Sequence, residues 1–247
     1  DHLEQWAVDI PETAWRLAAA FWPGPLTLIV KRAPWIPAAV SGGQDSIGLR
    51  VPAHPLALTL LQAYAVAGGG EKGLSGIAAP SANRFGRLSP TDAAHVREEL
   101  GDAVRVIVDG GRCPVGIEST IVDLTVPAGQ APRLLRPGRL SSEAIARVLG
   151  VKPTGPAATD VTTPRVSGSL AAHYAPQTPL QIVAGERLPH TLHALLEERK
   201  RCAVLCRQPQ FAAPASVAQR VLPDEPVGYA YGLYAALREL DGSGVDR

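Results

Sequence analysis

Three features of the sequence predict an α/β fold. Hydrophobic residues make up 46% of the 247 residues and charged residues 19%, a balance typical of globular rather than disordered chains. Short apolar runs of strand length alternate with amphipathic segments of helix length. Loops rich in proline and glycine separate them. A chain of this length can form one large α/β domain or two domains of ordinary size.

Helices and strands alternate through the first 150 residues. Pro11 suits the first turn of a helix, and Pro23 stops that helix because proline cannot continue it. Later helices end at Gly101 and Gly150. In chain order, the sequence predicts a helix at 11–22, strands at 26–30 and 46–51, a helix at 55–66, a strand at 76–79, a helix from Ser89 to Gly101, strands at 104–108, 120–124 and 133–135, and a helix that begins at Ser141 or Ser142.

The composition changes after Gly150. Residues 151–178 are rich in Pro, Thr, Gly and Ala and show no sustained periodicity, which is typical of a linker. Beyond them strand and helix patterns alternate, which predicts a small parallel α/β unit. Its predicted elements are a strand at 180–183, a helix at 188–200, a strand at 202–206 and a helix at 229–240. We therefore expect one domain at 1–150, a linker at 151–178 and a second domain at 179–247.

Charge and hydropathy restrict the class of function. The formal net charge is +1, and both domains carry nearly equal numbers of basic and acidic residues, so the sequence does not predict a strongly basic nucleic-acid surface. No apolar run approaches the roughly 18–20 residues of a membrane span, and the N-terminus lacks a signal-peptide pattern. We expect a cytoplasmic protein that does not bind membranes. Arginine outnumbers lysine 20 to 4, which suits carboxylate and phosphate binding but is equally typical of a GC-rich genome.

Cysteine, histidine and glycine patterns argue against several common sites. The three cysteines match neither a disulfide framework nor a zinc spacing, and Cys202 and Cys206 are expected to be buried thiols on a strand. His190 and His193 lack the acidic or cysteine partners of a metal site. The phosphate-binding pattern GxxxxGK[ST] does not occur.

A polar segment, PSAN, follows the apolar run at 76–79. Polar side chains at the carboxyl end of a strand face the usual ligand crevice of an α/β sheet. Ser81 and Asn83 can therefore bind a phosphate or sugar, although the same residues favour a simple turn. Ser89 is the predicted N-cap of the following helix, with Asp92 as the acid of a capping box. A helix start of this kind also attracts anions.

The strand at 46–51 places Ser46, Gly48 and Arg50 on one face, because side chains in a strand alternate with a period of two. Arg50, at the strand end, can clamp a carboxylate with two hydrogen bonds or form an ordinary surface ion pair. His54 precedes a proline at a helix start, where it can act as a cap, a surface group or a ligand.

Two further polar positions flank the strands at 120–124 and 133–135. Ser119 has no neighbouring histidine and no GxSxG context, so it is not a hydrolase nucleophile. Glu118 can serve as a general base, a metal ligand or an exposed acid. Arg136 is either a phosphate contact or a surface charge at a turn.

The order of these motifs is more informative than any one of them. It closely resembles the threonylcarbamoyl-AMP synthase family in its two-domain form, over essentially the whole chain. The resemblance implies a YrdC-like catalytic domain with a twisted mixed sheet, a linker that folds over the mouth of the site, and a small Rossmann-like parallel α/β domain. The motifs are WPGPLTLIV from Trp22, SIGLRVPAHP from Ser46, APSANRFGRLSPT from Ala79, VIVDGG from Val106, GIESTIVDL from Gly116, LLRPG from Leu134 and HYAPQTPL from His173.

The resemblance also implies the reaction. Enzymes of the family condense L-threonine, bicarbonate or CO2, and ATP into L-threonylcarbamoyladenylate and release pyrophosphate. The product is passed to tRNA threonylcarbamoyl-transferase proteins, which build N6-threonylcarbamoyladenosine in tRNA. The resemblance implies that ATP is a substrate and that Mg²⁺ accompanies the ATP. It also allows a weak direct contact with tRNA.

The family pattern assigns residues to each substrate, and it assigns no covalent nucleophile. The threonine carbamate and ATP, the two reactants of the second step, are both anionic, so the site needs fixed cations and hydrogen-bond donors more than a nucleophile. Asn83 belongs to the same motif as the ATP residues, with a role that the resemblance leaves open. L-Threonine is expected to contact Arg50, the backbone of Ala79, and Ser119; ATP is expected to contact Ser46, Ser81, Ser89, Arg136 and Tyr174.

The sequence departs from the family pattern at its ends. The family opens with a segment that carries a Lys-x-Arg motif, which does not occur here, and the chain begins at Asp1 and contains no methionine. We expect the N-terminal part of the catalytic domain to be missing from this sequence and the second domain to be incomplete at its C-terminal end.

Two alternatives remain open at this point. A carbamoyltransferase of hydrogenase maturation also uses a YrdC-like domain, but it adds an acylphosphatase-like domain and CxxC pairs that this sequence lacks. An RNA-binding module is the second alternative, since Arg50, Arg84, Arg87 and Arg136 can contact a phosphate backbone.

Overall fold

The computed structural model describes residues 2–70, 75–155, 163–168, 174–207 and 213–246. The chain forms two compact units. Unit 1 consists of Asp1–Pro80 and Glu118–Ser169, and unit 2 consists of Ser81–Ile117 and Leu170–Arg247. Residues 81–117, expected in the first domain, thus cluster with the C-terminal part of the chain. The domain boundaries expected at residues 150 and 178 stay a prediction.

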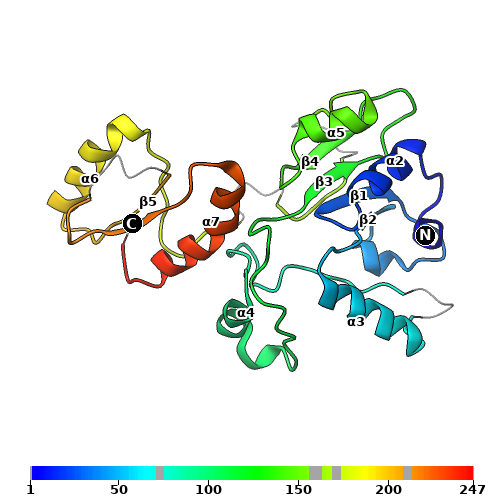
Figure 1. Ribbon diagram of the computed structural model, residues 1–247, viewed down its shortest axis with the longest axis horizontal. Coiled ribbons are helices and arrows are strands. Elements are labelled where there is room, and N and C mark those ends of the chain that lie inside the picture. Colours follow the sequence, from blue (N-terminus) through cyan, green and yellow to red (C-terminus); the bar gives the residue numbers. More distant parts are fainter. Residues whose placement is uncertain (1, 71–74, 156–162, 169–173, 208–212, 247) are drawn as a thin grey trace. The chain divides into compact units, whose positions relative to one another are not determined.

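A four-stranded mixed sheet forms the centre of unit 1 (Figure 1). Its strands lie in the order β2-β1-β3-β4. β1 pairs antiparallel with β2 and parallel with β3, and β3 pairs antiparallel with β4. The mixed sheet and its helices confirm the predicted α/β class, and all four strands lie where the sequence predicts strands. Their bounds are Leu26–Lys31 (β1), Ser46–Leu49 (β2), Thr120–Asp123 (β3) and Arg133–Arg136 (β4).

The helices of unit 1 follow local sequence signals closely. The Oγ of Ser141 accepts a hydrogen bond from the backbone N–H of Ala144, so Ser141 is the N-cap of α5. Gly150 ends α5 in the left-handed conformation that favours glycine. The elements are α1 (Leu3–Trp6), α2 (Glu12–Phe21), the short 3₁₀ helix η1 (Ala38–Ser41), α3 (Pro55–Val66) and α5 (Ser142–Leu149).

Helices α2 and α5 contact each other and share one apolar core with the sheet. Leu28 and Val30 of β1 are fully buried in this core, together with Leu17 of α2 and Ile145 of α5. Because side chains of a strand alternate between faces, the residues between them in β1 point to the opposite face. That opposite face carries the first group of candidate site residues.

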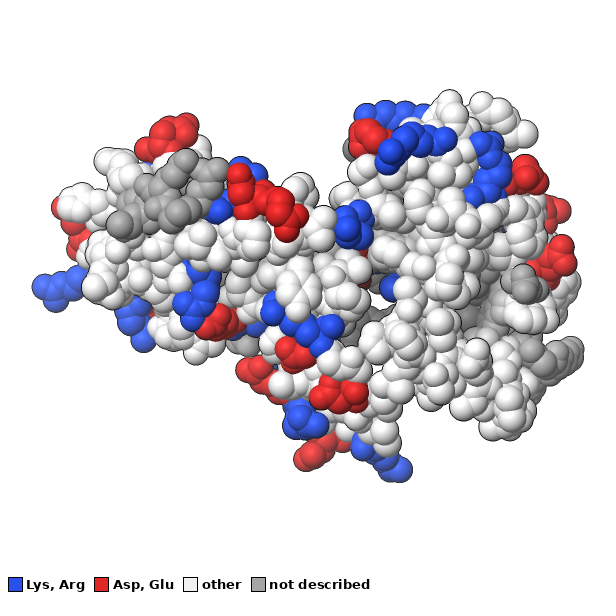
Figure 2. All heavy atoms as spheres, in the orientation of Figure 1, with Lys and Arg blue, Asp and Glu red and all other residues white. Residues whose placement is uncertain are grey.

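Helix α3 differs from the other helices of unit 1. It contains no charged residue and none of its side chains is buried. Figure 2 shows an uncharged surface over this helix, whereas basic and acidic side chains are interspersed elsewhere on the face shown. No helix in the described ranges is both long enough and apolar enough to cross a bilayer.

Unit 2 contains a two-stranded parallel sheet and three α-helices among its described residues. A small core, centred on Leu192, Cys202, Val204 and Val217, joins α6 to the sheet. The parallel pairing agrees with the predicted parallel α/β unit. The elements are α4 (Ala93–Leu100), η3 (Gly101–Ala103), η4 (Gly185–Arg187), α6 (Leu188–Glu197), β5 (Ala203–Cys206), β6 (Ala218–Val221) and α7 (Pro226–Asp241).

Three apolar runs predicted as strands, 76–79, 104–108 and 180–183, form no regular element. Val106 is 74% exposed and Ile182 is 96% exposed. An apolar run becomes a strand only where a neighbouring strand takes its backbone hydrogen bonds and a second layer buries its side chains. No pairing among the described residues involves these three runs. The sequence analysis also missed β6, whose four residues include two polar ones.

Helix α4 begins later than predicted. Its N-cap is Asp92 rather than Ser89, because the Asp92 carboxylate accepts a hydrogen bond from the backbone N–H of His95 at 3.0 Å. Ser89 and Thr91 are buried, and the carbonyl of Thr91 accepts a hydrogen bond from the N–H of Cys113 at 2.7 Å. Tertiary contacts thus hold residues 89–91, which the sequence predicts as the first turn of this helix, outside the helix.

None of the three cysteines, all of which lie in the described ranges, forms a disulfide bond. The expectation of two buried thiols on a strand is met in part: Cys202 is buried but lies directly before β5, and Cys206 lies within β5 but is only half-buried. Cys113 is exposed.

Candidate functional site

The face of the unit 1 sheet opposite α2 and α5 carries a small cluster of polar side chains. The Oγ1 of Thr27 and the Oγ of Ser119 are 2.8 Å apart. Arg136 donates from Nη2 to Ser119 Oγ and from Nε to the Ser119 carbonyl, both at 2.9 Å. The three residues come from β1, from the residue before β3, and from the end of β4. Adjacent strands therefore bring together residues that lie far apart in the sequence.

Arg136 is held firmly in this cluster. Its Nη1 donates to the carbonyl of Ser167 at 3.1 Å, and its Nη2 lies 3.6 Å from a carboxylate oxygen of Glu118. The Arg136 side chain is 11% exposed. A guanidinium fixed in this way is preorganised to stabilise negative charge without rearrangement. Glu118 is thus an ion-pair partner of Arg136.

The contacts of Ser119 are typical of a hydrogen-bonding side chain rather than of an activated nucleophile. Its hydroxyl contacts another hydroxyl and a guanidinium, whereas an activated serine needs a neighbouring base. This agrees with the sequence analysis. Thr27 was missed there, although the alternation in LTLIVK, with Leu26 and Leu28 buried, is the signal that could have located it.

The two ends of β2 carry Ser46 and Arg50. A Cβ placed on Gly48, between them, would approach side-chain atoms of Ile29 and Thr27 at 3.1 and 3.3 Å, so the face of Ser46 and Gly48 is the face that carries Thr27. Arg50 follows β2, and its Nε donates to the carbonyl of Gly24 at 3.0 Å. Four residue steps along an extended chain separate Ser46 from Arg50 by about 13 Å.

Val166, in the expected linker, lies on the same face. Val166 packs against Ile29, Ile121 and Leu135 of the sheet. The N–H of Arg165 donates to a side-chain oxygen of Gln44 at 2.7 Å. Residues 156–162 and 169–173 of the expected linker, including His173, lie outside the described residues. Ala79, the other expected threonine contact in unit 1, is exposed and lies outside helices and strands.

In unit 2, the polar segment 81–89 forms a compact turn. Asn83 donates from Nδ2 to the carbonyls of Arg84 and Arg87 at 2.8 and 3.1 Å, so Asn83 shapes the turn. Ser81 is exposed, whereas Ser89 is only 6% exposed. The two serines therefore flank a turn whose backbone is fixed by the amide between them.

Tyr174 lies against this turn. The N–H of Ala175 donates to the carbonyl of Gly86 at 3.1 Å, and Ala175 forms an isolated parallel bridge with Arg87. Tyr174 has a φ of +57°, which is uncommon for a residue other than glycine. Unit 2 thus brings the HYAP motif beside the SANRFGR motif, which the sequence separates widely.

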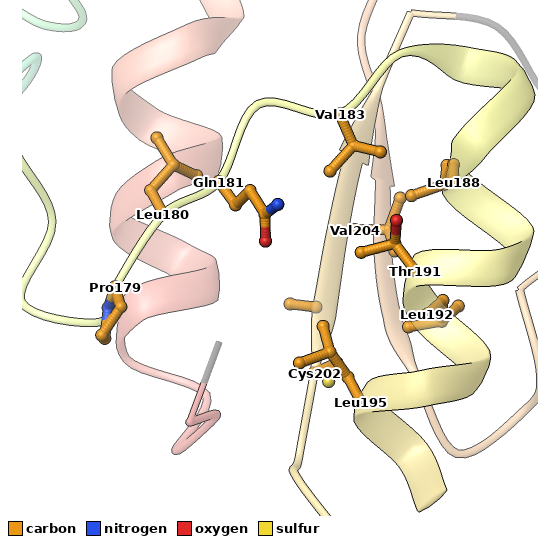
Figure 3. A pocket seen from close by; sticks show the side chains of 11 residues that line it. Pro179, Leu180, Gln181, Val183, Leu188, Thr191, Leu192, Leu195, Cys202 and Val204 are labelled. Carbon is orange, nitrogen blue, oxygen red and sulfur yellow. The ribbon is translucent and has the colours of Figure 1, made fainter. Parts of the chain in front are cut away.

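A pocket in unit 2, shown in Figure 3, is of a different kind. Leu188, Thr191 and Leu192 of α6 face Val204 of β5 across it. None of its lining side chains is charged, so it does not offer the cations that ATP phosphates need. It is lined by Pro179, Leu180, Gln181, Val183, Leu188, Thr191, Leu192, Leu195, Cys202, Ala203 and Val204.

These features are typical of one class of protein: an α/β protein whose candidate site offers arginine, hydroxyl and backbone groups to an anionic ligand. Among the described residues, no three His, Cys, Asp or Glu side chains gather where they could share a metal ion. The candidate hydrogen-bond donors of the site are guanidinium and hydroxyl groups.

Sequence models of protein families identify both parts of the chain. Residues 1–138 match the Sua5/YciO/YrdC model, described as "Telomere recombination". Residues 140–247 match the model described as "Threonylcarbamoyl-AMP synthase, C-terminal domain". The chain belongs to the threonylcarbamoyl-AMP synthase family, in its two-domain form.

Individual relatives agree with this assignment. The threonylcarbamoyl-AMP synthase of Pyrococcus abyssi is 37% identical over 254 residues, which cover 100% of this chain and 70% of the relative. That of Bacillus subtilis is 36% identical over 253 residues, covering 99% and 69%. The crystal structure of P. abyssi Sua5 complexed with L-threonine superposes with a TM-score of 0.85 at 36% identity, covering 99% of this chain and 70% of that one. The family and fold expectations are thereby confirmed, whereas the individual site residues stay predictions.

Proposed function

We propose that this chain makes L-threonylcarbamoyladenylate from L-threonine, bicarbonate or CO2, and ATP. The observation that carries this proposal is the similarity over the whole chain to two-domain synthases, one of which is solved with L-threonine. The same similarity favours the synthase over the carbamoyltransferase alternative, because the C-terminal match is specific to the synthase.

The reaction has two steps that the site must support. The threonine amine adds to CO2, loses a proton and becomes a carbamate. A carbamate oxygen then attacks the α-phosphorus of ATP, a P–O bond forms, and pyrophosphate leaves. The carbamate and the triphosphate are both anionic, so fixed cations and hydrogen-bond donors lower the barrier more than any nucleophile. The arrangement around Arg136 is of this kind.

The threonine contacts are proposed in unit 1. Arg50 would bind the carboxylate, since its Nε bond to Gly24 fixes the plane of the guanidinium. Ser119 would contribute its hydroxyl, and Ala79 its backbone. The short distance between Ser119 and Thr27 supports a role for Thr27 in orienting that hydroxyl.

The ATP contacts are proposed in both units. Arg136 and Ser46 of unit 1 would contact the nucleotide, and so would Ser81, Ser89 and Tyr174 of unit 2. Asn83 would act by shaping the turn between the serines, since both of its amide bonds go to the backbone of that turn.

Magnesium would enter as MgATP, held by the phosphates, because the described residues offer no carboxylate cage. The reactive product would pass to tRNA threonylcarbamoyl-transferase proteins in the cytoplasm, and direct tRNA contact would be weak.

The test is pyrophosphate release by the complete protein from ATP, with and without L-threonine and bicarbonate. We expect release only when all three substrates are present, and little release when L-alanine replaces L-threonine. Release that does not depend on threonine would contradict the proposed function. Binding of tRNA without any threonine-dependent release would favour the RNA-binding alternative.

A further inference from the structure

Helix α7 directs three polar or aromatic side chains to one side. Tyr234, Arg238 and Asp241 are spaced by four and three residues, so they share one face of the helix. Tyr234 is buried, and the Arg238 side chain is 11% exposed. All contacts of this face described below lie within unit 2.

Arg238 and Glu99 connect α7 to α4 (Figure 1). Nη1 and Nη2 of Arg238 each lie 3.2 Å from the same carboxylate oxygen of Glu99. The Glu99 side chain is 13% exposed, so water screens this pair weakly. Nη2 of Arg238 also donates to the carbonyl of Leu88. The other Glu99 oxygen accepts a hydrogen bond from the N–H of Arg84 at 3.1 Å. The ion pair thus holds both ends of the 84–88 turn.

The other two residues of this face hold the segment 174–178. The Tyr234 and Tyr174 rings are stacked, with centroids 5.9 Å apart and an angle of 27° between planes. The Asp241 carboxylate accepts hydrogen bonds from the N–H groups of Gln177 and Thr178, both at 2.8 Å. Burial opposes ionisation of Asp241, but these hydrogen bonds outweigh it and lower the pKa of the carboxyl group.

The first half of α7 holds the end of the 81–117 segment as well. The guanidinium of Arg112 lies 4.2 Å from the centre of the Tyr231 ring and donates to the Tyr231 carbonyl at 3.3 Å. A Cβ on Gly116, whose φ is +77°, would lie 2.4 Å from the Tyr231 Cα. Only glycine allows this approach. α7 therefore contacts the segment that carries Ser81 and Ser89 at Leu88 and Glu99 and again near its end, at Arg112 and Gly116.

We infer that α7 is the positioning element for the nucleotide contacts of unit 2, and that the C-terminal domain thereby sets the affinity for ATP. Tyr234, Arg238 and Asp241 are positioning residues, because they hold the turn between Ser81 and Ser89 and the segment that begins at Tyr174. This inference rests on the proposed function. It assigns the second domain a role in the synthase reaction itself.

The test compares the Michaelis constants for the two substrates in the complete protein. In Tyr234→Leu and in the double variant Glu99→Gln/Arg238→Met, we expect the KM for ATP to rise about tenfold, as loss of about one positioning contact would give. The KM for L-threonine should change less than about twofold, because its contacts lie outside unit 2. Tyr234→Phe keeps the stacked ring and should retain the ATP affinity.

Glu239→Gln is the matched control. Glu239 lies on α7 and pairs with Arg220, but both side chains are about half exposed, so the control removes an ion pair of the same helix without touching the proposed face. Its KM for ATP should equal that of the unchanged protein. Thermal midpoints of all variants show whether each remains folded.

Equal rises in both KM values, or a lower thermal midpoint with unchanged KM for ATP, would overturn the inference and leave α7 a purely structural helix.

Equilibrium binding of a non-hydrolysable ATP analogue separates this inference from the proposed function. If the unchanged protein lacks threonine-dependent pyrophosphate release, the proposed function fails; if analogue binding then still falls in Tyr234→Leu but not in Tyr234→Phe, the role of α7 stands. If the affinity for the analogue is the same in Tyr234→Leu, in Tyr234→Phe and in the unchanged protein, or if the analogue does not bind at all, the inferred role of α7 is overturned.

Discussion

At the scale of single residues, Arg50 and Arg136 occupy different environments although both follow strands. Arg136 is tied to Ser119 through a side-chain and a backbone acceptor and pairs with Glu118. Arg50 is more exposed, and its Nε bond goes to the carbonyl of Gly24. A guanidinium whose orientation is fixed by a backbone hydrogen bond is suited to recognise a small carboxylate.

Arg50→Ala tests this difference. We expect the KM for L-threonine to rise about 10- to 100-fold, the effect of removing a charged hydrogen bond worth about 1.5–3 kcal/mol. The KM for ATP should change by less than about twofold. Steady-state pyrophosphate release, with each substrate varied in turn, measures both constants.

Arg147→Ala on the exposed side of α5 is the control and should change neither constant. Equal effects of Arg50→Ala on both substrates would show that Arg50 does not distinguish the threonine carboxylate from the nucleotide.

Residue contacts in the candidate site were only partly predictable. The period of two on β2 correctly placed Ser46 and Gly48 on one face. The bond between Thr27 and Ser119 joins residues 92 positions apart, and it depends on the parallel pairing of β1 with β3. No local pattern encodes such a pairing. The irregular register between β3 and β4 near Ile121 likewise affects how Arg136 meets Ser119.

At the scale of elements, the turn after β4 determines the geometry of the cluster around Ser119. A Cβ on Gly138 would lie 2.6 Å from the Glu118 carbonyl and 2.6 Å from the Thr120 nitrogen. Both are backbone atoms, so they cannot move aside as a flexible side chain can. The LLRPG motif thus requires glycine because the turn lies directly against the start of β3.

Gly138→Ala should therefore destabilise the protein and disturb the site together. We expect a loss of about 1–3 kcal/mol, typical of overpacking, which lowers the thermal midpoint by several degrees at about 2–4 °C per kcal/mol. The rate of pyrophosphate release should fall because Ser119 and Arg136 move apart. Differential scanning fluorimetry and the activity assay measure the two effects.

Gly155→Ala is the matched control, since a Cβ there meets no atom within 4 Å. It should leave both the thermal midpoint and the activity unchanged. A stable, fully active Gly138→Ala variant would show that the turn can relax without moving β3.

Helix ends show the same division between local and tertiary control. The cap of α5 at Ser141 was predictable because it depends on a side chain and a backbone group three residues away. The start of α4 was not, because Ser89 and Thr91 are buried and the carbonyl of Thr91 accepts a hydrogen bond from Cys113 instead.

At the scale of the whole molecule, the charge distribution limits what the chain can bind without specific contacts. The formal net charge is +1, and Figure 2 shows basic and acidic side chains interspersed on the face drawn. Binding of polyanions through general electrostatic attraction requires many unopposed lysines and arginines.

We therefore expect weak tRNA binding with a shallow salt dependence, equivalent to about three phosphate contacts or fewer in a plot of log K against log salt concentration. Fluorescence anisotropy of labelled tRNA at several salt concentrations measures the slope. A steep slope, equivalent to about six or more phosphates, would show a continuous basic surface in the complete protein and would favour the RNA-binding alternative.

The sequence by itself determined the α/β class, the four strands of unit 1, most helix positions and the family, because these depend on local periodicity, on caps and on the order of motifs. The tertiary structure alone decided which apolar runs became strands and that residues 81–117 cluster with the C-terminal part. It also decided that one face of α7 meets both Glu99 and the 174–178 segment. These features arise from contacts between residues far apart in the chain, whose free energy depends on burial and pairing that no short stretch of sequence contains.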